Sequence, residues 1–538
     1  MKSPGADAIR LTKTRIEALM STRMAFYFGA ALFGMCLCGD LLNADDWVVV
    51  PKASREKRLA PELDLLRHCD GHHRFKGVSR KGKAVFDVPA GQAKKVQSMS
   101  IAMNPNIPRI SPWGKRLLIS YAGQGAKPSE ATLKAAGLNK VEDYERGSFL
   151  VVEPQDAVSS ETVETLLGDD AVAYAAPDYF MSVSPVKPTE MAQPLIAGST
   201  PNDPLFNQLW GMQNIGATQV WPAFHETPKI IVAVIDTGVD YNHPDLKANM
   251  WSKNGRHGYD FYDDDDDPMD EQNHGTHCSG TIAGAGNNGV GVVGVSWKAQ
   301  IMAMRFLGQD GSGSTSDAVK CIDWAVANGA HILSNSWAGP DTSPELAEAV
   351  TRAEQRGVLF VAAAGNTGGG GNDNDTAPYF PASLPNSNVI TVGAIDVNNA
   401  PGSFTHYGKR TVDIGAPGVG IVSTTRNNTY DKYDGTSMAA PHVAGAAALV
   451  WAKTFPSPAP DRAQMTKVRD LIYENARPVP ALKGLWGYTS PARVPGGVLD
   501  ISFLNNTPPN GNPTPNPPSP VGRRLVENRM KVDPAKFR

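Results

Sequence analysis

Long apolar runs, a framework of cysteines and an excess of either charge are all missing from this sequence. Its 51 basic and 54 acidic residues leave a formal net charge of −3, which gives no argument for nucleic-acid binding. Its five cysteines are too few and too scattered for a disulfide framework. No apolar run reaches the roughly 18–20 residues that a membrane-spanning helix needs. What remains is a globular composition, with 41% hydrophobic and 20% charged residues.

A short apolar run, Met24–Cys38, follows Arg23 near the N-terminus. A basic flank before a short apolar run is typical of a secretory signal. Because the preceding segment is long for such a signal, translation could start at Met20 or Met24. We therefore expect a secreted protein, extracellular or periplasmic, with no membrane span.

A chain of 538 residues is too long for one hydrophobic core, so several units are expected. Proline-rich stretches near residues 185–194 and 508–520 mark two linkers. The expected division is a signal region (1–39), an unassigned segment (40–114), a small α+β domain (115–183), a linker (184–200), the main domain (201–505) and a Pro/Asn-rich linker with a basic tail (506–538).

The small domain has alternating strand and helix patterns. Glutamates near the start of its second helix suit the helix dipole, and a proline in its last strand suits a sheet edge. The predicted strands are Leu117–Tyr121, Phe149–Val152 and Val172–Pro177, and the predicted helices are Glu130–Ala136 and Ser160–Leu167.

The main domain alternates short apolar runs with helical patterns, which indicates an α/β fold with a mostly parallel sheet covered by helices on both faces. Active sites on such sheets lie at the carboxyl ends of the strands. The predicted strands are Ile230–Ile235, Ile301–Arg305, Ile332–Asn335, Val358–Ala364 and Val389–Val392, and helices are predicted over Asp317–Ala327 and Pro344–Arg356.

A carboxylate, an imidazole and a hydroxyl lie at the ends of predicted elements. Asp236 ends an apolar strand, His274 opens a His-Gly-Thr-His helical motif, and Ser437 precedes an apolar helix within Gly-Thr-Ser-Met-Ala-Ala-Pro-His. Thr436 is expected to cap that helix, with Pro441 in its first turn. A serine at a helix N-terminus faces unpaired N–H groups, which suit a developing oxyanion. The order Asp, His, Ser is that of the subtilisin triad.

Over most of residues 201–500 the chain therefore resembles the subtilisin family of serine proteases. Asn202-Asp203-Pro204 and Cys278 make it similar to thermitase-type members, and residues 115–183 resemble the family's inhibitory propeptide. The motifs that carry the resemblance are Asp236–Gly238, His274–His277 and Gly435–His442.

The resemblance implies hydrolysis of protein or peptide substrates by a zymogen that processes itself and acts as a monomer. Ser437 is the expected nucleophile, His274 its general base and Asp236 the group that orients the imidazole. Asn366 is expected to donate its side-chain amide to the oxyanion. His277 and His442 are expected to be buried structural residues, and Cys278 a free thiol beneath His274.

Two segments resemble the family's substrate-binding walls, although Trp337 departs from the usual Gly-rich pattern, and Tyr379 falls near the pocket floor. The candidate substrate-binding residues are Ser336, Trp337, Ala338, Gly339, Ala364 and Gly365.

Calcium is the expected cofactor, because a dense group of acids before His274 suits a hard cation. The resemblance implies one site in this acidic loop, with the Met269 carbonyl, and a second site with carbonyls near residues 285, 290 and 292. The candidate ligands are Asp260, Asp263, Asp265 and Asp267 in the loop, and Asp203, Asp245 and Asn288 in the second site.

Two alternatives can be weighed from the sequence. A catalytically inactive scaffold of the same fold would not need the three motifs and Asn366 together. A sedolisin-type enzyme uses a glutamate in place of the histidine, whereas His274 lies in an intact motif.

Overall fold

A computed structural model describes residues 116–121, 127–155, 165–166, 169–183, 201–487 and 493–506, and the backbone of short strands between residues 47 and 100. The predicted signal region, the 184–200 linker and the tail beyond residue 506 lie outside the described residues. The short N-terminal strands are β1 (Trp47–Val49), β2 (Arg74–Val78), β3 (Lys83–Asp87), β4 (Lys95–Gln97) and β5 (Met99–Ser100). In this part β1 pairs with β4, and β3 lies between β2 and β5.

A nine-stranded sheet forms the centre of the main domain, in the order β12-β13-β11-β15-β16-β17-β18-β22-β21. All neighbours are parallel except β21 and β22, so the predicted α/β architecture is confirmed. The strands are β11 (Ile231–Asp236), β12 (Gly258–Asp260), β13 (Gln300–Arg305), β15 (Ile332–Asn335), β16 (Leu359–Ala363), β17 (Val389–Ile395), β18 (Ile414–Pro417), β21 (Arg477–Pro478) and β22 (Gly497–Val498).

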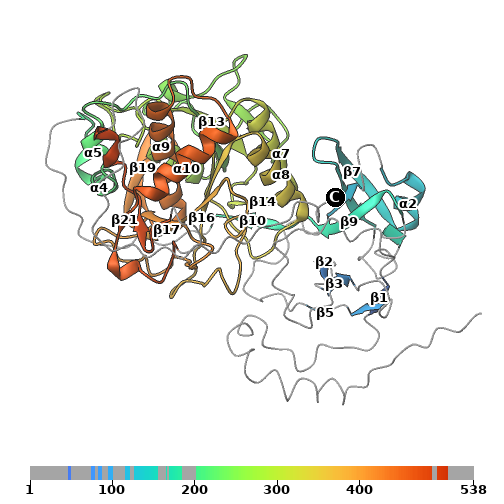
Figure 1. Ribbon diagram of the computed structural model, residues 1–538. Coiled ribbons are helices and arrows are strands. Elements are labelled where there is room, and N and C mark those ends of the chain that lie inside the picture. Colours follow the sequence, from blue (N-terminus) through green and yellow to red (C-terminus); the bar gives the residue numbers. More distant parts are fainter. Residues whose placement is uncertain are drawn as a thin grey trace, which may run out of the picture.

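Helices cover both faces of this sheet (Figure 1). Successive residues of β11 face opposite sides, so Val232 and Val234 pack into one apolar cluster while Ala233 and Ile235 pack into another. The first cluster contains α6 (His274–Ala283), α9 (Thr436–Thr454) and α10 (Arg462–Glu474), and the second contains α7 (Thr315–Ala327) and α8 (Pro344–Gln355).

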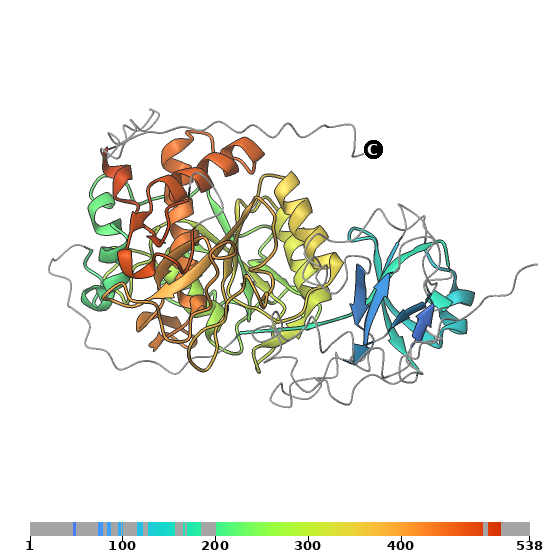
Figure 2. The same ribbon diagram turned by 60° about the horizontal axis from the view of Figure 1, so that its bottom comes forward.

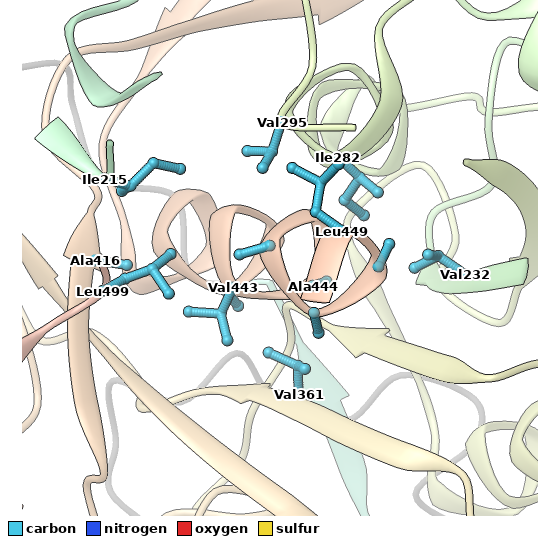
Figure 3. Packing of buried hydrophobic residues seen from close by; sticks show 14 of the residues in the cluster. Ile215, Val232, Ile282, Val295, Val361, Ala416, Val443, Ala444, Leu449 and Leu499 are labelled. Carbon is cyan, nitrogen blue, oxygen red and sulfur yellow. The ribbon is translucent and has the colours of Figure 1, made fainter. Parts of the chain in front are cut away.

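Helix α9 runs through the middle of the first cluster (Figure 3). It is apolar around its whole circumference and buried from Thr436 to Trp451, as expected of a core helix. Its small side chains let neighbours approach closely. A Cβ added at Gly445 would lie 2.8 Å from the Cβ of Val295. This packing fixes the start of α9, and therefore Ser437, relative to the sheet.

The remaining elements of the main domain are short. They are α4 (Trp210–Asn214), α5 (Ala217–Val220), β14 (Ser312–Ser314), the antiparallel pair β19 (Ile421–Thr425) and β20 (Thr429–Tyr433), and 3-10 turns at Phe206–Gln208, Lys247–Asn249, Pro480–Leu482 and Ser502–Asn506. Within the described part of the chain, every helix is too short or too polar to cross a membrane.

The domain over residues 115–183 has a four-stranded antiparallel sheet in the order β7-β8-β6-β9. Its predicted strands are present, and the last of them lies at the sheet edge as expected. Strand β7 was not predicted from the sequence, because its residues are mostly polar. The predicted helix Ser160–Leu167 lies largely outside the described residues. The elements are β6 (Leu117–Tyr121), α2 (Glu130–Ala135), β7 (Leu138–Tyr144), β8 (Phe149–Pro154), β9 (Val172–Pro177) and β10 (Phe180–Ser182).

This small domain lies beside α7 and α8 in both views (Figures 1 and 2). One face of β6 and β8 belongs to the small domain's own core. From the opposite face, Leu118, Phe149 and Val151 join the apolar cluster that contains α7 and α8. The two domains therefore share a buried apolar interface.

Candidate active site

Asp236 and His274 form a buried pair at the carboxyl end of β11. The Nδ1 atom of His274 lies 2.8 Å and 3.0 Å from the two carboxylate oxygens of Asp236. Helix α6, which carries His274, approaches the turn after Asp236 so closely that a Cβ at Gly275 would lie 2.1 Å from the carbonyl oxygen of Gly238. The glycine in the His-Gly-Thr-His motif is therefore needed for this contact.

Asp270 connects the two elements that carry this pair. Its carboxylate accepts hydrogen bonds from the Thr237 hydroxyl, from the backbone and hydroxyl of Thr276, and from the backbone of Asn273. Thr237 in turn accepts from the backbone N–H of Gly275. These bonds take over the role of an N-cap for α6, where Asn273 provides no side-chain cap and has a φ of 134°. Sequence reasoning missed Asp270, because no motif singles it out.

The pKa of His274 reflects opposing effects. Burial is the largest single effect and lowers the pKa, but the charge and hydrogen bond of Asp236 together with those of Cys278 raise it well above its usual value. The imidazole is therefore prepared to accept a proton.

Ser437 lies in the first turn of α9, and two predictions about this helix are wrong. The N-cap position is Gly435 rather than Thr436, and Pro441 lies inside the helix rather than in its first turn. The Thr436 hydroxyl instead accepts from the backbone of Gly365 and donates to Asn366. Tertiary contacts of this kind override the local preference of threonine for a cap.

Pro441 has a consequence for the backbone of Ser437. Because proline lacks an N–H, the carbonyl of the residue four positions earlier loses its helical partner. That carbonyl belongs to Ser437, and it accepts from the Ser336 hydroxyl at 3.0 Å and the Cys278 thiol at 3.4 Å. The Ser437 hydroxyl donates to the carbonyl of Ser336 at 3.0 Å. The two serines are thus bonded reciprocally.

Asn366 lies beside the start of α9. Its side-chain oxygen accepts from the backbone N–H and the hydroxyl of Thr436, at 2.9 Å and 3.0 Å. Because a backbone N–H can only donate, this contact fixes which end of the amide is oxygen.

The other histidines and the cysteine of the motifs are buried. His277 bonds to the carbonyls of Ile421 and Asp431, and burial lowers its pKa to about 3. His442 bonds to the Met438 carbonyl, and burial lowers its pKa to about 4. Cys278 is a buried free thiol whose Sγ atom lies 4.0 Å from Nδ1 of His274. The expectation that these residues are buried is confirmed.

A carboxylate–imidazole pair beside a serine at a helix start can carry out nucleophilic acyl transfer. The family model described as the subtilase family matches residues 227–495, half of the chain. The chain belongs to the subtilase family. It is a subtilisin-like serine peptidase.

Among curated relatives of this subtilase, the thermophilic serine proteinase of Bacillus sp. (strain AK1) is 38% identical over 60% of this chain and 74% of its own. Thermitase of Thermoactinomyces vulgaris is 42% identical over 47% of this chain and 85% of its own. Among solved structures, fervidolysin from Fervidobacterium pennivorans, a keratinolytic enzyme related to subtilisin, has a TM-score of 0.58 and 26% identity. That match covers 73% of this chain and 61% of fervidolysin.

Ala338, one of the predicted substrate-binding residues of this subtilase, lies at an edge that already carries a strand. Ala338 and Ser182 exchange backbone hydrogen bonds, at 3.0 Å and 3.2 Å, as an antiparallel bridge. On its other side the strand of Ser182, β10, pairs antiparallel with β14. Strand β10, the C-terminal end of the small domain, therefore runs between β14 and the Ser336–Gly339 segment.

Met181, in the middle of β10, is enclosed by the main domain. Met181 is fully buried, and a Cβ at Gly339 would lie 2.9 Å from its sulfur. Trp337 is buried against Phe306 rather than exposed as a wall. Ala364 is also buried, and a Cβ at Gly365 would lie 2.9 Å from the Tyr379 ring.

The second predicted calcium site is brought together by the fold. Asp203 and Asp245 are buried, burial raises the pKa of both, and the charge of Asp245 raises that of Asp203 further. Asn288 donates to Asp245 at 2.7 Å, and its backbone N–H lies 3.4 Å from Asp203. The two buried carboxylates repel one another, and a bound cation would offset both charges, so these residues fit a calcium site.

The acidic loop is different, because Arg305 already lies in it. Its guanidinium contacts Asp260 at 2.6 Å, Asp263 at 2.8 Å and Glu271 at 2.9 Å. Asp267 accepts instead from Tyr241, and Asp265 from the backbone of residue 267. Among the described residues, no three acids of this loop have ligand atoms within 4.8 Å of one another. The predicted ligands of this loop are thus held by Arg305, Tyr241 and a backbone N–H group, and the calcium site in the loop stays a prediction.

Proposed function

We propose that this subtilase cleaves peptide bonds with Asp236, His274 and Ser437 as its catalytic triad. The observation that carries the proposal is the buried Asp236–His274 pair, with Cys278 in contact with both His274 and the Ser437 carbonyl. The catalytic hydroxyl must turn from the Ser336 carbonyl toward His274 when substrate binds. Catalytic hydrogen bonds are often formed only in the substrate complex.

In the proposed reaction the Ser437 oxygen attacks the substrate carbonyl while His274 takes the hydroxyl proton. Asp236 stabilises the imidazolium that forms. The amide of Asn366 and the backbone N–H of Ser437 would donate to the oxyanion. His274 then gives its proton to the departing amine, and water releases the acyl group by the same steps in reverse order.

A fluorophosphonate probe tests this assignment. We expect it to label the processed wild-type enzyme once, and to label neither Ser437→Ala nor His274→Ala. Ser279→Ala is the matched control, because that serine is also buried but its hydroxyl donates to the Gly275 carbonyl within α6. Labelling that survives in Ser437→Ala would contradict the proposed nucleophile.

We further propose that residues 115–183 are an inhibitory propeptide, that residues 184–200 contain the processing site, and that residues 201–505 are the catalytic domain. The support is β10, which occupies the edge that a substrate strand would use. Met181→Asp should weaken this docking and speed probe labelling of the precursor. Val141→Asp is the control, because Val141 is exposed in the same domain. Equal labelling rates for wild type and both variants would contradict the proposed inhibitory role.

Export and calcium binding complete the proposal. Export rests on the apolar run Met24–Cys38 after Arg23. Asp203, Asp245 and Asn288 would hold the calcium ion, which would fix the loop after α6 and oppose local opening.

A further inference from the structure

The interface between the proposed propeptide and the catalytic domain contains a buried acid with an incomplete set of partners. Successive residues of β6 alternate between the two apolar clusters, and Leu118 faces the catalytic domain. Ser120, two residues later, faces the same way, and its hydroxyl donates to the Glu345 carboxylate at 2.7 Å. Glu345 lies in the first turn of α8 and is 1% exposed.

The second carboxylate oxygen of Glu345 is buried and has no hydrogen-bond partner. The groups that act on the carboxylate are the Ser120 hydroxyl from β6, and the Ser343 hydroxyl, its own backbone N–H and the Glu348 side chain from α8. None of these is a cation. The N-terminus of α8 favours a negative charge, but burial beneath the small domain opposes it.

Other acids at the interface have better partners. Asp323 bonds to Arg352 at 2.8 Å, and it also accepts from Tyr144 of the small domain. Lys320 contacts both Asp317 and Glu142 of the small domain.

Asp178, just after β9, accepts from the backbone and hydroxyl of Ser316 at the start of α7. Asp317 and Lys320 are the charged groups that act on it. Among these interface acids, Glu345 is the one left with a buried oxygen that has no partner.

We propose that docking of the small domain places a proton on Glu345. The domain would then bind the Ser336–Gly339 edge most tightly in mildly acidic solution, and more weakly as the pH rises. The inference rests on the proposed inhibitory role of residues 115–183. The binding step is then docking plus uptake of one proton, and release returns that proton to solvent.

The direction of the effect follows from the pKa shifts. Burial raises the pKa of Glu345 to about 7, and burial with the charge of Asp317 raises that of Asp178 to about 6. Once the small domain leaves, Glu345 would lose the cover of β6, and its pKa would fall toward its usual value. A group with a raised pKa in the docked state stabilises docking below that pKa and loses the contribution as pH rises through it. For Glu345 alone, docking should weaken about tenfold between pH 6 and pH 8.

Hydrogen exchange on the full chain carrying Ser437→Ala tests this without self-cleavage. The readout is the protection of the backbone N–H groups of Ala338 and Ser182, each of which donates to the carbonyl of the other residue. The exchange rates are corrected for the pH dependence of chemical exchange. We expect about a tenfold loss of protection from pH 6 to pH 8. Adding Glu345→Gln should abolish the pH dependence. Adding Glu348→Gln should preserve the pH dependence and move it slightly to lower pH, because that exposed side chain raises the pKa of Glu345 and is the last of the causes.

A second variant, Ser120→Ala, keeps the proposal testable if the small domain of the Glu345→Gln chain does not dock. The Ser120 hydroxyl favours the charged carboxylate, so Ser120→Ala should raise the pKa of Glu345 and move the loss of protection to higher pH. A pH-independent protection in the parent, or an unchanged profile with Glu345→Gln, would overturn the proton-linked docking. An absence of protection at every pH would overturn the proposed inhibitory role itself.

Discussion

Arg305 offers the sharpest test of how this subtilase holds its acidic loop. Its side chain is 5% exposed and Asp260 is fully buried, whereas Asp263 and Glu271 are half-exposed. Truncation in Arg305→Met would leave the Asp260 charge buried without its partner. Breaking a buried ion pair costs about 3–5 kcal/mol, whereas exposed partners contribute below about 1 kcal/mol each. We therefore expect a loss of about 3–5 kcal/mol.

The loss should depend on pH in a defined direction. Burial, despite Arg305, raises the pKa of Asp260 to about 6, and removal of the guanidinium should raise it further. A raised carboxyl pKa means that the folded variant is favoured by protonation at low pH. The deficit of Arg305→Met should therefore be small near pH 5 and should grow as pH rises, by up to about 1.4 kcal/mol per unit.

The assay is thermal unfolding of Ser437→Ala chains, which cannot digest themselves, followed by circular dichroism at one scan rate. At about 2–4 °C per kcal/mol, we expect a Tm lower by about 10 °C at pH 8. Arg256→Met is the matched control, because its ion pair with Asp266 is half-exposed. The double variant Asp260→Leu/Arg305→Met should recover much of the loss, since no unpaired charge remains. A loss no larger than that of Arg256→Met would refute the reasoning.

Three further outcomes are expected. Asn366→Ala should lower kcat by a factor of about 10²–10³ with little change in KM, which is the range for the oxyanion asparagine of subtilisin itself. An unchanged kcat would contradict the oxyanion role of Asn366. Pro441→Ala supplies a backbone N–H that competes with the Ser336 hydroxyl for the Ser437 carbonyl. We expect kcat to fall about tenfold at nearly constant Tm. A lower Tm with an unchanged kcat would show that the proline has only a structural role. EDTA should lower the Tm of the Ser437→Ala chain, and Asp245→Asn should abolish that response; an EDTA response that survives in Asp245→Asn would place the calcium elsewhere.

Sequence alone was sufficient for the framework of this protein. The apolar runs around Ile230, Ile301 and Ile332 are buried on both faces, and only a parallel sheet with helices on both sides uses such runs repeatedly. The motifs around Asp236 and His274 predicted the buried pair, because each requires a specific residue at the end of a strand or the start of a helix. These signals are local, so they can be read without the fold.

Contacts between distant segments decided the rest. Thr436 bonds to Asn366 instead of capping α9, and Arg305 pairs with Asp260, an acid that was predicted as a calcium ligand. Glu345 looks like an ordinary first-turn acid until Ser120, 225 residues earlier, covers it. In each case the local sequence fixes which groups are available, whereas burial and the partner across the fold decide which charge or hydrogen bond is kept. The free energy of a buried polar group depends on its partners, and only the tertiary structure supplies them.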